Sequence, residues 1–315
     1  MFTSRKTLLT AAVAGAILAP ATAAHAAPTT LAVEQAPTRV AAWNGTVMWS
    51  TFDPATKTYS LVKSVGGGAP VAVGVAPRAG TPFDIDLGTG RSGDTFAVYT
   101  RRGDVYRLNI ATGGETRMSR ISSPKLVERD PTIQRGAIAF IRRSGGLDEL
   151  RIADTNTGTR ATKLIVKRRS IRNAELGEGH VAYVDARPTR AGGVMTVHVR
   201  NLRTGADRSV YRAASGGANF ANVTKPVYAA EPQGFLWART NMGSGRGNRL
   251  VRYTLADSKL AVTAGSAHYN TMAWASEALG AVTSGSLDGS ESQGACTDAG
   301  TSYCNVVLSG ALQFG

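Results

Sequence analysis

Cysteine, histidine and acidic residues are scarce in this sequence. Its 315 residues include 2 cysteines and 4 histidines, and 22 Asp and Glu stand against 36 Lys and Arg. This scarcity excludes a disulfide-dense scaffold, and no cluster of Cys and His has the spacing of a zinc site. No G-x-S-x-G string occurs, so an α/β-hydrolase domain is not expected. Catalysis is therefore not the first expectation for this chain.

The excess of basic residues gives a formal net charge of +14. A strongly basic surface attracts polyanions such as anionic polymers, lipids or nucleic acid. The alternative is that arginine is simply abundant, because most basic residues are scattered along the chain. Specific nucleic-acid binding is not expected, since the sequence has no basic tail or arm.

Long apolar runs are also missing, except at the N-terminus. Residues 1–26 place Arg5 and Lys6 before an apolar run and end in Ala24-His25-Ala26, the pattern of a secretory signal peptide. The run is too short for a spanning helix and is broken by Pro20. We expect cleavage after Ala26 and a secreted or cell-envelope protein with no transmembrane segment. The two cysteines, Cys296 and Cys304, then form a local disulfide; the alternative is two free thiols.

The mature chain repeats one pattern at intervals of roughly 40 to 50 residues, the size of a propeller blade. A turn residue is followed by a short aliphatic, small and aromatic run; the copies read GTVMWS, DTFAVYT, GAIAFIR, GHVAYVD, GFLWART and, more weakly, LGAVTSG. Each of the first copies is followed by an alternating strand, a turn and another strand. Gly113, Gly158 and Gly205 are expected at equivalent hairpin turns, where positive φ favours glycine.

Another strand precedes each copy, as in PFDIDLG, DPTIQRG and RNAELGEG, and would be the innermost of four. Four short strands per unit, Gly-rich connections and no helical periodicity predict an all-β fold. We predict a β-propeller of six blades, each with four antiparallel strands, over residues 27–315 as a single domain. The segment TTLAVEQ near the N-terminus is expected to close the ring by adding an outer strand to the last blade. A sandwich pair or a β-solenoid is the alternative.

These segments carry a resemblance. DPTIQRGAIAFIR and PFDIDLGTGRSGDTFAVYTRR resemble TolB-type, WD-like propeller repeats, including secreted actinobacterial propellers of unknown function. The usual Ser-Pro-Asp-Gly turn of such repeats is replaced here by Gln-Arg-Gly, Gly-Glu-Gly and Pro-Gln-Gly. The resemblance implies the fold, with ligand or protein binding as its common use, and it transfers no site residue.

One candidate cation site lies in FDIDLGTGRSGD, where Asp84 and Asp86 offer oxygen ligands in a Gly-rich segment. Calcium is the metal that such ligands suit, but the order of an EF-hand is missing. Alternate residues of a strand share a face, so Asp84 and Asp86 could equally point to solvent or to the central channel.

A second candidate site is the mouth of the channel, where the inner strands begin. This ring mixes basic and hydrogen-bonding side chains, which suits an anionic or carbohydrate ligand better than a metal. The candidate residues are Arg129, Asp130, Arg172, Asn173, Lys225 and Asn270. The alternative is a ring of ordinary solvated side chains.

The sequence therefore predicts a secreted binding scaffold. Its ligand would be an extracellular or envelope protein, or an anionic or carbohydrate molecule. The alternative is a hydrolase or lyase with a calcium-assisted site at the channel mouth. The sequence does not indicate an oligomeric state.

Overall fold

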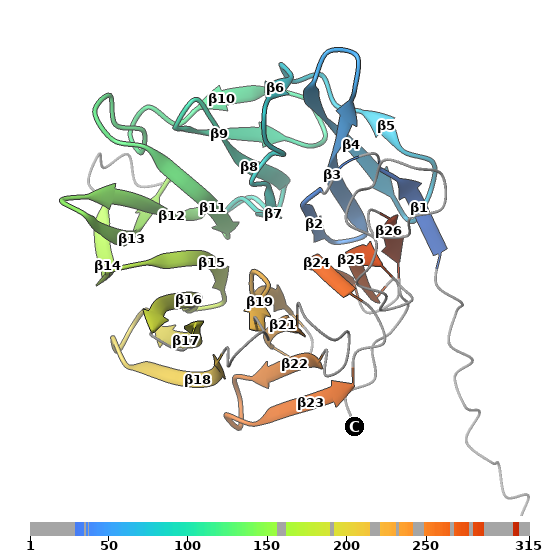
Figure 1. Ribbon diagram of the computed structural model, residues 1–315. Helices are drawn as coiled ribbons and strands as arrows, with labels where there is room; N and C mark the ends of the chain where they lie inside the picture. The colour runs from blue at the N-terminus through green and yellow to red at the C-terminus, as the bar shows by residue number, and fades with distance from the viewer. Residues whose placement is uncertain are drawn as a thin grey trace, which may run out of the picture.

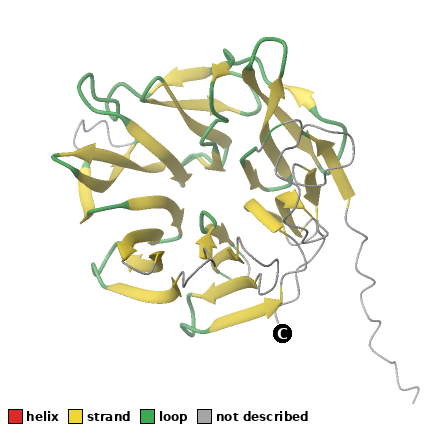
Figure 2. Ribbon diagram, viewed as in Figure 1, coloured by secondary structure: helices red, strands yellow, loops and turns green. Residues whose placement is uncertain are grey.

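The structure, a computed structural model, describes residues 29–34, 36, 38–155, 162–189, 192–214, 221–230, 233–241, 249–264, 268–276, 280–286 and 305–308. Antiparallel sheets formed by these residues are arranged as a ring around a central axis (Figures 1 and 2). No helix occurs in the described ranges, and so none that could cross a membrane. The all-β class and the β-propeller of four-stranded antiparallel blades are confirmed. The predicted signal peptide, Gly158 and both cysteines lie outside the described residues.

Five blades are built from strands that follow one another in the chain. Blade 1 contains β2 (Val40–Trp43), β3 (Thr46–Asp53), β4 (Thr58–Val65), β5 (Val71–Ala72) and β6 (Arg78–Ala79). Blade 2 contains β7 (Asp86–Thr89), β8 (Thr95–Arg101), β9 (Asp104–Asn109) and β10 (Glu115–Arg117). Blade 3 contains β11 (Glu128–Gln134), β12 (Ala137–Ser144), β13 (Leu147–Asp154) and β14 (Lys163–Arg168).

The next two blades follow the same order around the ring. Blade 4 contains β15 (Ile171–Gly177), β16 (His180–Thr189), β17 (Gly192–Asn201) and β18 (Asp207–Ala214). Blade 5 contains β19 (Ala221–Val223), β20 (Val227–Ala229), β21 (Gly234–Asn241), β22 (Arg249–Thr254) and β23 (Leu260–Ala264). In Figure 1 the first strand of each blade lies next to the axis and the last lies on the rim.

A further sheet closes the ring with strands from both ends of the chain. It contains β24 (His268–Ser276), β25 (Gly280–Ser286), β26 (Asn305–Leu308) and β1 (Thr29–Val33). β1 pairs antiparallel with β26 and forms the outer edge of this sheet. The predicted closure by the N-terminal segment is therefore confirmed. Pairing the two ends protects edges that an open ring would leave free.

Tight hairpins join the inner strand to the second strand. In blades 1 and 3 the turn residues Asn44-Gly45 and Arg135-Gly136 all have positive φ, between 45° and 77°. Two consecutive left-handed residues define the type I′ turn, whose twist matches that of the flanking strands. Gly113 and Gly205 also have positive φ, as predicted for the later hairpins.

The hydrophobic core is divided among the interfaces between blades. Met48 and Leu61 of blade 1 pack in one buried cluster with Tyr99 of blade 2, for example, and other clusters join blades 2 and 3, 3 and 4, and 4 and 5. Blades 2, 3 and 4 therefore each bury both faces against their neighbours.

The aromatic residue of the second strand reaches outward to an acid in three places. The Trp49 indole donates to Glu34, and the hydroxyls of Tyr99 and Tyr183 donate to Glu115 and Asp207. Burial raises the pKa of both tyrosines, and the bonded carboxylates raise it further. A buried polar group needs such a partner to avoid the cost of desolvation.

The innermost strands are linked to one another by side-chain acceptors. Asp86, Thr132 and Glu175 occupy the same repeat position, because each pairs with the residue that precedes the aromatic of the second strand. Each accepts a backbone hydrogen bond from the inner strand of the next blade. The bonds run from Ile133 N to Asp86 Oδ2 at 3.0 Å, from Leu176 N to Thr132 Oγ1 at 3.0 Å, and from Tyr228 N to Glu175 Oε1 at 3.3 Å.

We expect Thr132→Val to destabilise the protein by about 1–3 kcal/mol, because it leaves a buried N–H group without an acceptor. Thr132 has no exposed surface, and its hydroxyl also donates to Glu175 Oε2 at 3.1 Å. Thr132→Ser retains the hydroxyl, so we expect it to lose less stability than Thr132→Val. Urea denaturation of both variants measures the difference, and equal stability of Thr132→Val and wild type would contradict this role.

Candidate ligand-binding site at the channel mouth

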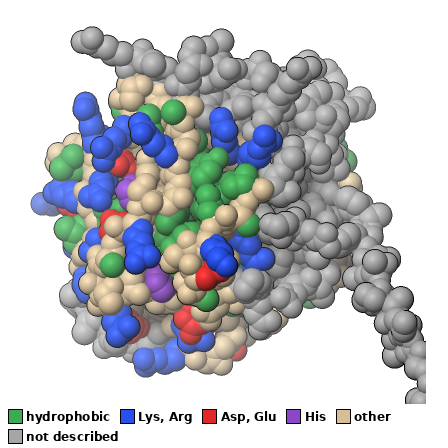
Figure 3. Space-filling model, turned by 90° about the horizontal axis from the view of Figure 1, so that it is seen from below, with side chains coloured by type: hydrophobic (Ala, Val, Ile, Leu, Met, Phe, Trp, Pro, Cys, Tyr) green, Lys and Arg blue, Asp and Glu red, His purple; other side chains and the backbone are tan. Residues whose placement is uncertain are grey.

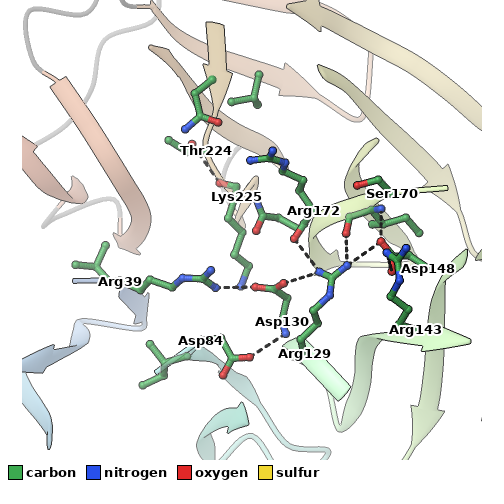
Figure 4. Close-up of a pocket in the computed structure, with 16 residues that line it drawn as sticks. Arg39, Asp84, Arg129, Asp130, Arg143, Asp148, Ser170, Arg172, Thr224 and Lys225 are labelled. Atoms are coloured by element: carbon green, nitrogen blue, oxygen red, sulfur yellow. Dashed lines mark hydrogen bonds and ion pairs between the residues drawn. The ribbon is translucent and has the colours of Figure 1, made fainter. Parts of the chain in front are cut away.

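A cavity of about 510 Å³ opens where the inner strands begin (Figure 4). Five of the six residues predicted for the channel mouth line it, and Asp84 joins them. The five are Arg129, Asp130, Arg172, Asn173 and Lys225. The sixth, Asn270, lies in β24, and its side chain is outside the described part of the chain.

The repeat explains why these residues meet. Two residues before the acceptor position of each inner strand, the chain places one side chain in a layer above the acceptors; in β11 and β15 a shift of register precedes the acceptor position. That upper layer faces the cavity; its described members are Arg39, Asp84, Asp130, Asn173 and Lys225. The channel is thus lined by two layers of side chains, and the upper layer carries most of the charge.

A chain of ion pairs crosses the mouth from blade 1 to blade 3. Arg39 Nη1 lies 2.6 Å from Asp130 Oδ1, and Arg129 Nη1 lies 3.0 Å from Asp130 Oδ2. Arg129 Nη2 lies 2.9 Å from Asp148 Oδ2, and Arg143 Nη1 lies 3.2 Å from Asp148 Oδ1. The charges alternate along the chain, so each carboxylate has two cationic partners.

Arg129 is held most firmly in this chain. Its guanidinium also donates to the carbonyls of Ile171 and Arg172, at 2.6 and 3.2 Å. The Asp148 side chain is almost fully buried, and its Oδ2 accepts from Ile171 N at 2.9 Å. Planar guanidinium groups bonded on several sides lose little further freedom when a ligand arrives. The wall of the cavity is therefore preorganised.

Lys225 forms the floor of the cavity. It extends from the upper layer down to the lower layer, where its Nζ lies 2.9 Å from both Asp86 Oδ1 and Glu175 Oε2. One ammonium group thus joins blades 2, 4 and 5 across the axis. A much smaller cavity beneath it is lined by the same three residues together with Trp43 and Tyr228.

Burial and the neighbouring charges together control the protonation of Lys225 and Glu175. Burial disfavours the charge of Lys225, but the Asp86 and Glu175 carboxylates outweigh it and raise the lysine pKa. The pKa of Glu175 is raised to about 8, because burial disfavours its carboxylate and the Asp86 charge repels it, while Lys225 opposes both. A buried group of two carboxylates and one ammonium would carry a net negative charge. A proton on Glu175 makes the group neutral.

Both carboxylates of the predicted calcium site have protein donors. Asp84 accepts hydrogen bonds from Thr100 N and Oγ1 and from Asp130 N, at 2.6–3.0 Å. Asp86 accepts from Ile133 N and Lys225 Nζ. N–H and ammonium donors point at the oxygens that a cation would need, so this arrangement does not fit calcium. Among the described residues, no group of three or more His, Cys, Asp or Glu could hold a metal ion.

Several polar groups of the cavity remain free for a ligand. The side chains of Arg172, Asn173, Asn222 and Ser170 have no ion pair or hydrogen bond within the described residues. In Figure 4 the backbone carbonyl of Arg172 accepts a hydrogen bond from Arg129, and the Arg172 side chain takes no part in the chain of ion pairs. The described lining has five cationic and three acidic side chains. An exposed guanidinium beside amide groups is suited to bind an anion that also carries hydroxyls.

Sequence reasoning missed Arg39, Asp148 and Asn222 as lining residues. Arg39 lies two residues before Ala41, just as Asp84 and Asp130 lie two residues before the equivalent Asp86 and Thr132, so alignment of the repeats would have found it. Asp148 comes from the β12–β13 hairpin and carries no repeat signal. His180 and His198 lie in β16 and β17, outside this cavity, and the His198 ring stacks on Tyr183 at 4.8 Å.

No family model and no curated protein sequence matches this chain. Among solved structures, TolB from Acinetobacter baumannii is similar at 14% identity, with a TM-score of 0.50 over 71% of this chain and 53% of that one. This chain thus spans about half the length of that TolB chain.

An oligogalacturonate lyase in complex with manganese is similar at 12% identity, with a TM-score of 0.53 over 84% of this chain and 76% of that one. An oligogalacturonate lyase from Vibrio parahaemolyticus has 8% identity and a TM-score of 0.51 over 82% and 74% of the two chains. At these identities the likeness concerns the fold alone. It confirms the resemblance to TolB-type propellers at that level.

We expect Lys225→Met to destabilise the protein by about 3–5 kcal/mol at neutral pH, because it leaves the buried Asp86 carboxylate, beside the protonated Glu175, without its cation. Adding Asp86→Asn and Glu175→Gln to Lys225→Met removes the uncompensated charge and should recover much of the loss. Urea denaturation of the single and triple variants measures both effects. A single variant as stable as wild type would contradict the role of Lys225 as the link across the axis.

The raised pKa of Glu175 predicts a pH dependence of stability. The folded state retains a proton on Glu175 up to about pH 8, whereas the unfolded chain releases it near the ordinary value of 4.5. Between these values the folded state binds more protons, so this group makes stability fall as pH rises. Glu175→Gln should remove that contribution. Unfolding free energies from pH 5 to 8 test this, and parallel curves for the two proteins would contradict it.

Proposed function

We propose that this chain is a β-propeller binding module that holds a small acidic carbohydrate in its channel-mouth cavity. The observation that carries the proposal is Arg172, an exposed guanidinium without a side-chain partner in the described residues, at the edge of a preorganised cavity. Arg172 would bind the carboxylate of the ligand, and Asn173, Asn222 and Ser170 would bind its hydroxyls.

The size and charge of the cavity support this ligand class. Its volume of about 510 Å³ lies within the range of small-molecule sites, roughly 300–1,000 Å³. The ion pairs already neutralise Asp130 and Asp148, so a ligand anion meets no free carboxylate from them. Two of the similar solved structures are named as oligogalacturonate lyases, which makes an oligomer of galacturonate a reasonable probe.

The proposal includes a location and a wider role. The pattern of residues 1–26 supports export, so the ligand would be met outside the cell or in the envelope. A disc of blades with many loops can also present one face to a protein partner, the second use that the sequence suggested.

We expect the mature protein to bind trigalacturonate and Arg172→Ala to bind it roughly tenfold more weakly, because a hydrogen-bonded ion pair is lost. Arg120→Ala is the matched control, since Arg120 is exposed and does not line the cavity. Isothermal titration calorimetry measures both affinities, with the neutral maltotriose as a ligand control.

Three results would contradict the proposal. The protein could fail to bind trigalacturonate, or it could bind trigalacturonate and maltotriose equally well. The third result is that Arg172→Ala and Arg120→Ala lose the same affinity for trigalacturonate. Titration with and without calcium distinguishes the alternative of a calcium-assisted enzyme. We expect calcium to leave the affinity unchanged; calcium-dependent binding or cleavage of the oligomer would favour the enzyme instead.

A further inference from the structure

The rim of blades 3 and 4 carries an excess of basic side chains. Residues 162–170 and 201–214 include seven Lys and Arg residues and a single acid, Asp207. Six of the seven are exposed, and we call them the basic rim: Lys163, Lys167, Arg169, Arg203, Arg208 and Arg212. Figure 3 views the molecule from below and shows Lys and Arg side chains spread over the described surface, with fewer acidic ones.

The two outer strands of the basic rim are joined into one surface. Arg168, at the end of β14, reaches the start of β18, where its Nη2 lies 3.3 Å from Asp207 Oδ2. Asp207 also accepts a hydrogen bond from Tyr183 and lies near His198 and Arg200. Asp207 is therefore already paired with side chains that are themselves buried or only partly exposed. It does not neutralise the exposed cations beside it.

Most cations of the basic rim have no side-chain partner within the described part of the chain. Lys167 pairs with Glu149 at 3.1 Å, and Arg208 donates to Ser258 at 3.2 Å. The side chains of Lys163, Arg169, Arg203 and Arg212 make no ion pair or hydrogen bond within the described residues.

On blade 2, two cations in the strands are paired with acids. There Arg117 pairs with Asp104 at 2.8 Å, and Arg101 pairs with Glu115 at 2.9 Å. Exposed cations without a side-chain partner in the described residues also occur beside blade 2, at Arg91, Arg102, Arg120 and Lys125, but these lie in its turns. The basic rim differs in that such cations also lie along its outer strands, as Lys163 does in β14 and Arg212 in β18.

We infer that the basic rim is a binding surface for a linear anionic polysaccharide, separate from the channel-mouth cavity. β14 and β18 have 6 and 8 residues, so they extend for roughly 20 and 27 Å along the rim. Cations spread over such a length match repeated charges on a long chain better than one small anion. The described basic rim has no exposed aromatic side chain on which nucleic-acid bases could stack.

The test measures binding of polygalacturonate to the mature protein over a range of salt concentrations. Arg169, Arg203 and Arg212 are changed together to Glu. The control changes Arg91, Arg120 and Lys125 to Glu; these are exposed residues of blade 2 and its adjoining turns, and the charge changes by the same amount. We expect the rim variant to bind at least roughly tenfold more weakly at low salt and with a shallower salt dependence, because fewer counterions are displaced. The control should lose much less.

Three outcomes would overturn the inference. The wild-type protein could fail to bind polygalacturonate at low salt, or the two triple variants could lose the same affinity for it. The third outcome is that single-stranded DNA of equal charge binds more tightly than polygalacturonate. A triple change of the rim residues to Gln, which removes charge without reversing it, should give an intermediate loss if the folded protein is intact. Trigalacturonate binding should be unchanged in the rim variant, so failure here is distinguishable from failure of the cavity proposal.

Discussion

The innermost strands of the propeller hydrogen-bond to a neighbouring strand on one side only, and their remaining N–H groups must find acceptors near a crowded axis. Side chains from the preceding blade supply these acceptors at one repeat position, occupied by Asp86, Thr132 and Glu175. Because unsatisfied buried donors are costly, these bonds set how the blades are placed around the axis. The packing between blades and the lining of the channel depend on that placement.

Using carboxylates as acceptors has an electrostatic consequence. Asp86 and Glu175 bring carboxyl groups into the channel, and Lys225 of a third blade, 2.9 Å from each, neutralises their charge together with a proton on Glu175. The lysine closes the floor of the cavity that the upper layer lines. Features that stabilise the centre of the ring therefore also shape the candidate site. Arg172 is the charged exception, since no ion pair or hydrogen bond within the described part of the chain uses its side chain.

Much of this fold was predictable, because each repeat contains the same local signals. Hairpin glycines, alternating strands and the closing N-terminal strand could all be derived from the chain, and the channel-mouth residues followed from where inner strands begin. Asp84 and Asp86 show the limit. Two acids on one face of a strand suit a cation equally well in the sequence, but the neighbouring inner strand, β11 of blade 3, points backbone donors at both.

The sequence by itself determined the repeat, the class of fold and the basic character of the protein, because these depend on periodicity and composition. Only the tertiary structure decided which charges are paired. Arg39 and Asp130 stand far apart in the chain yet lie 2.6 Å apart across the mouth, and Lys225 reaches Asp86 over a still longer separation. A ring places every inner strand near all the others, so ion pairs across its axis follow from geometry that local sequence does not contain.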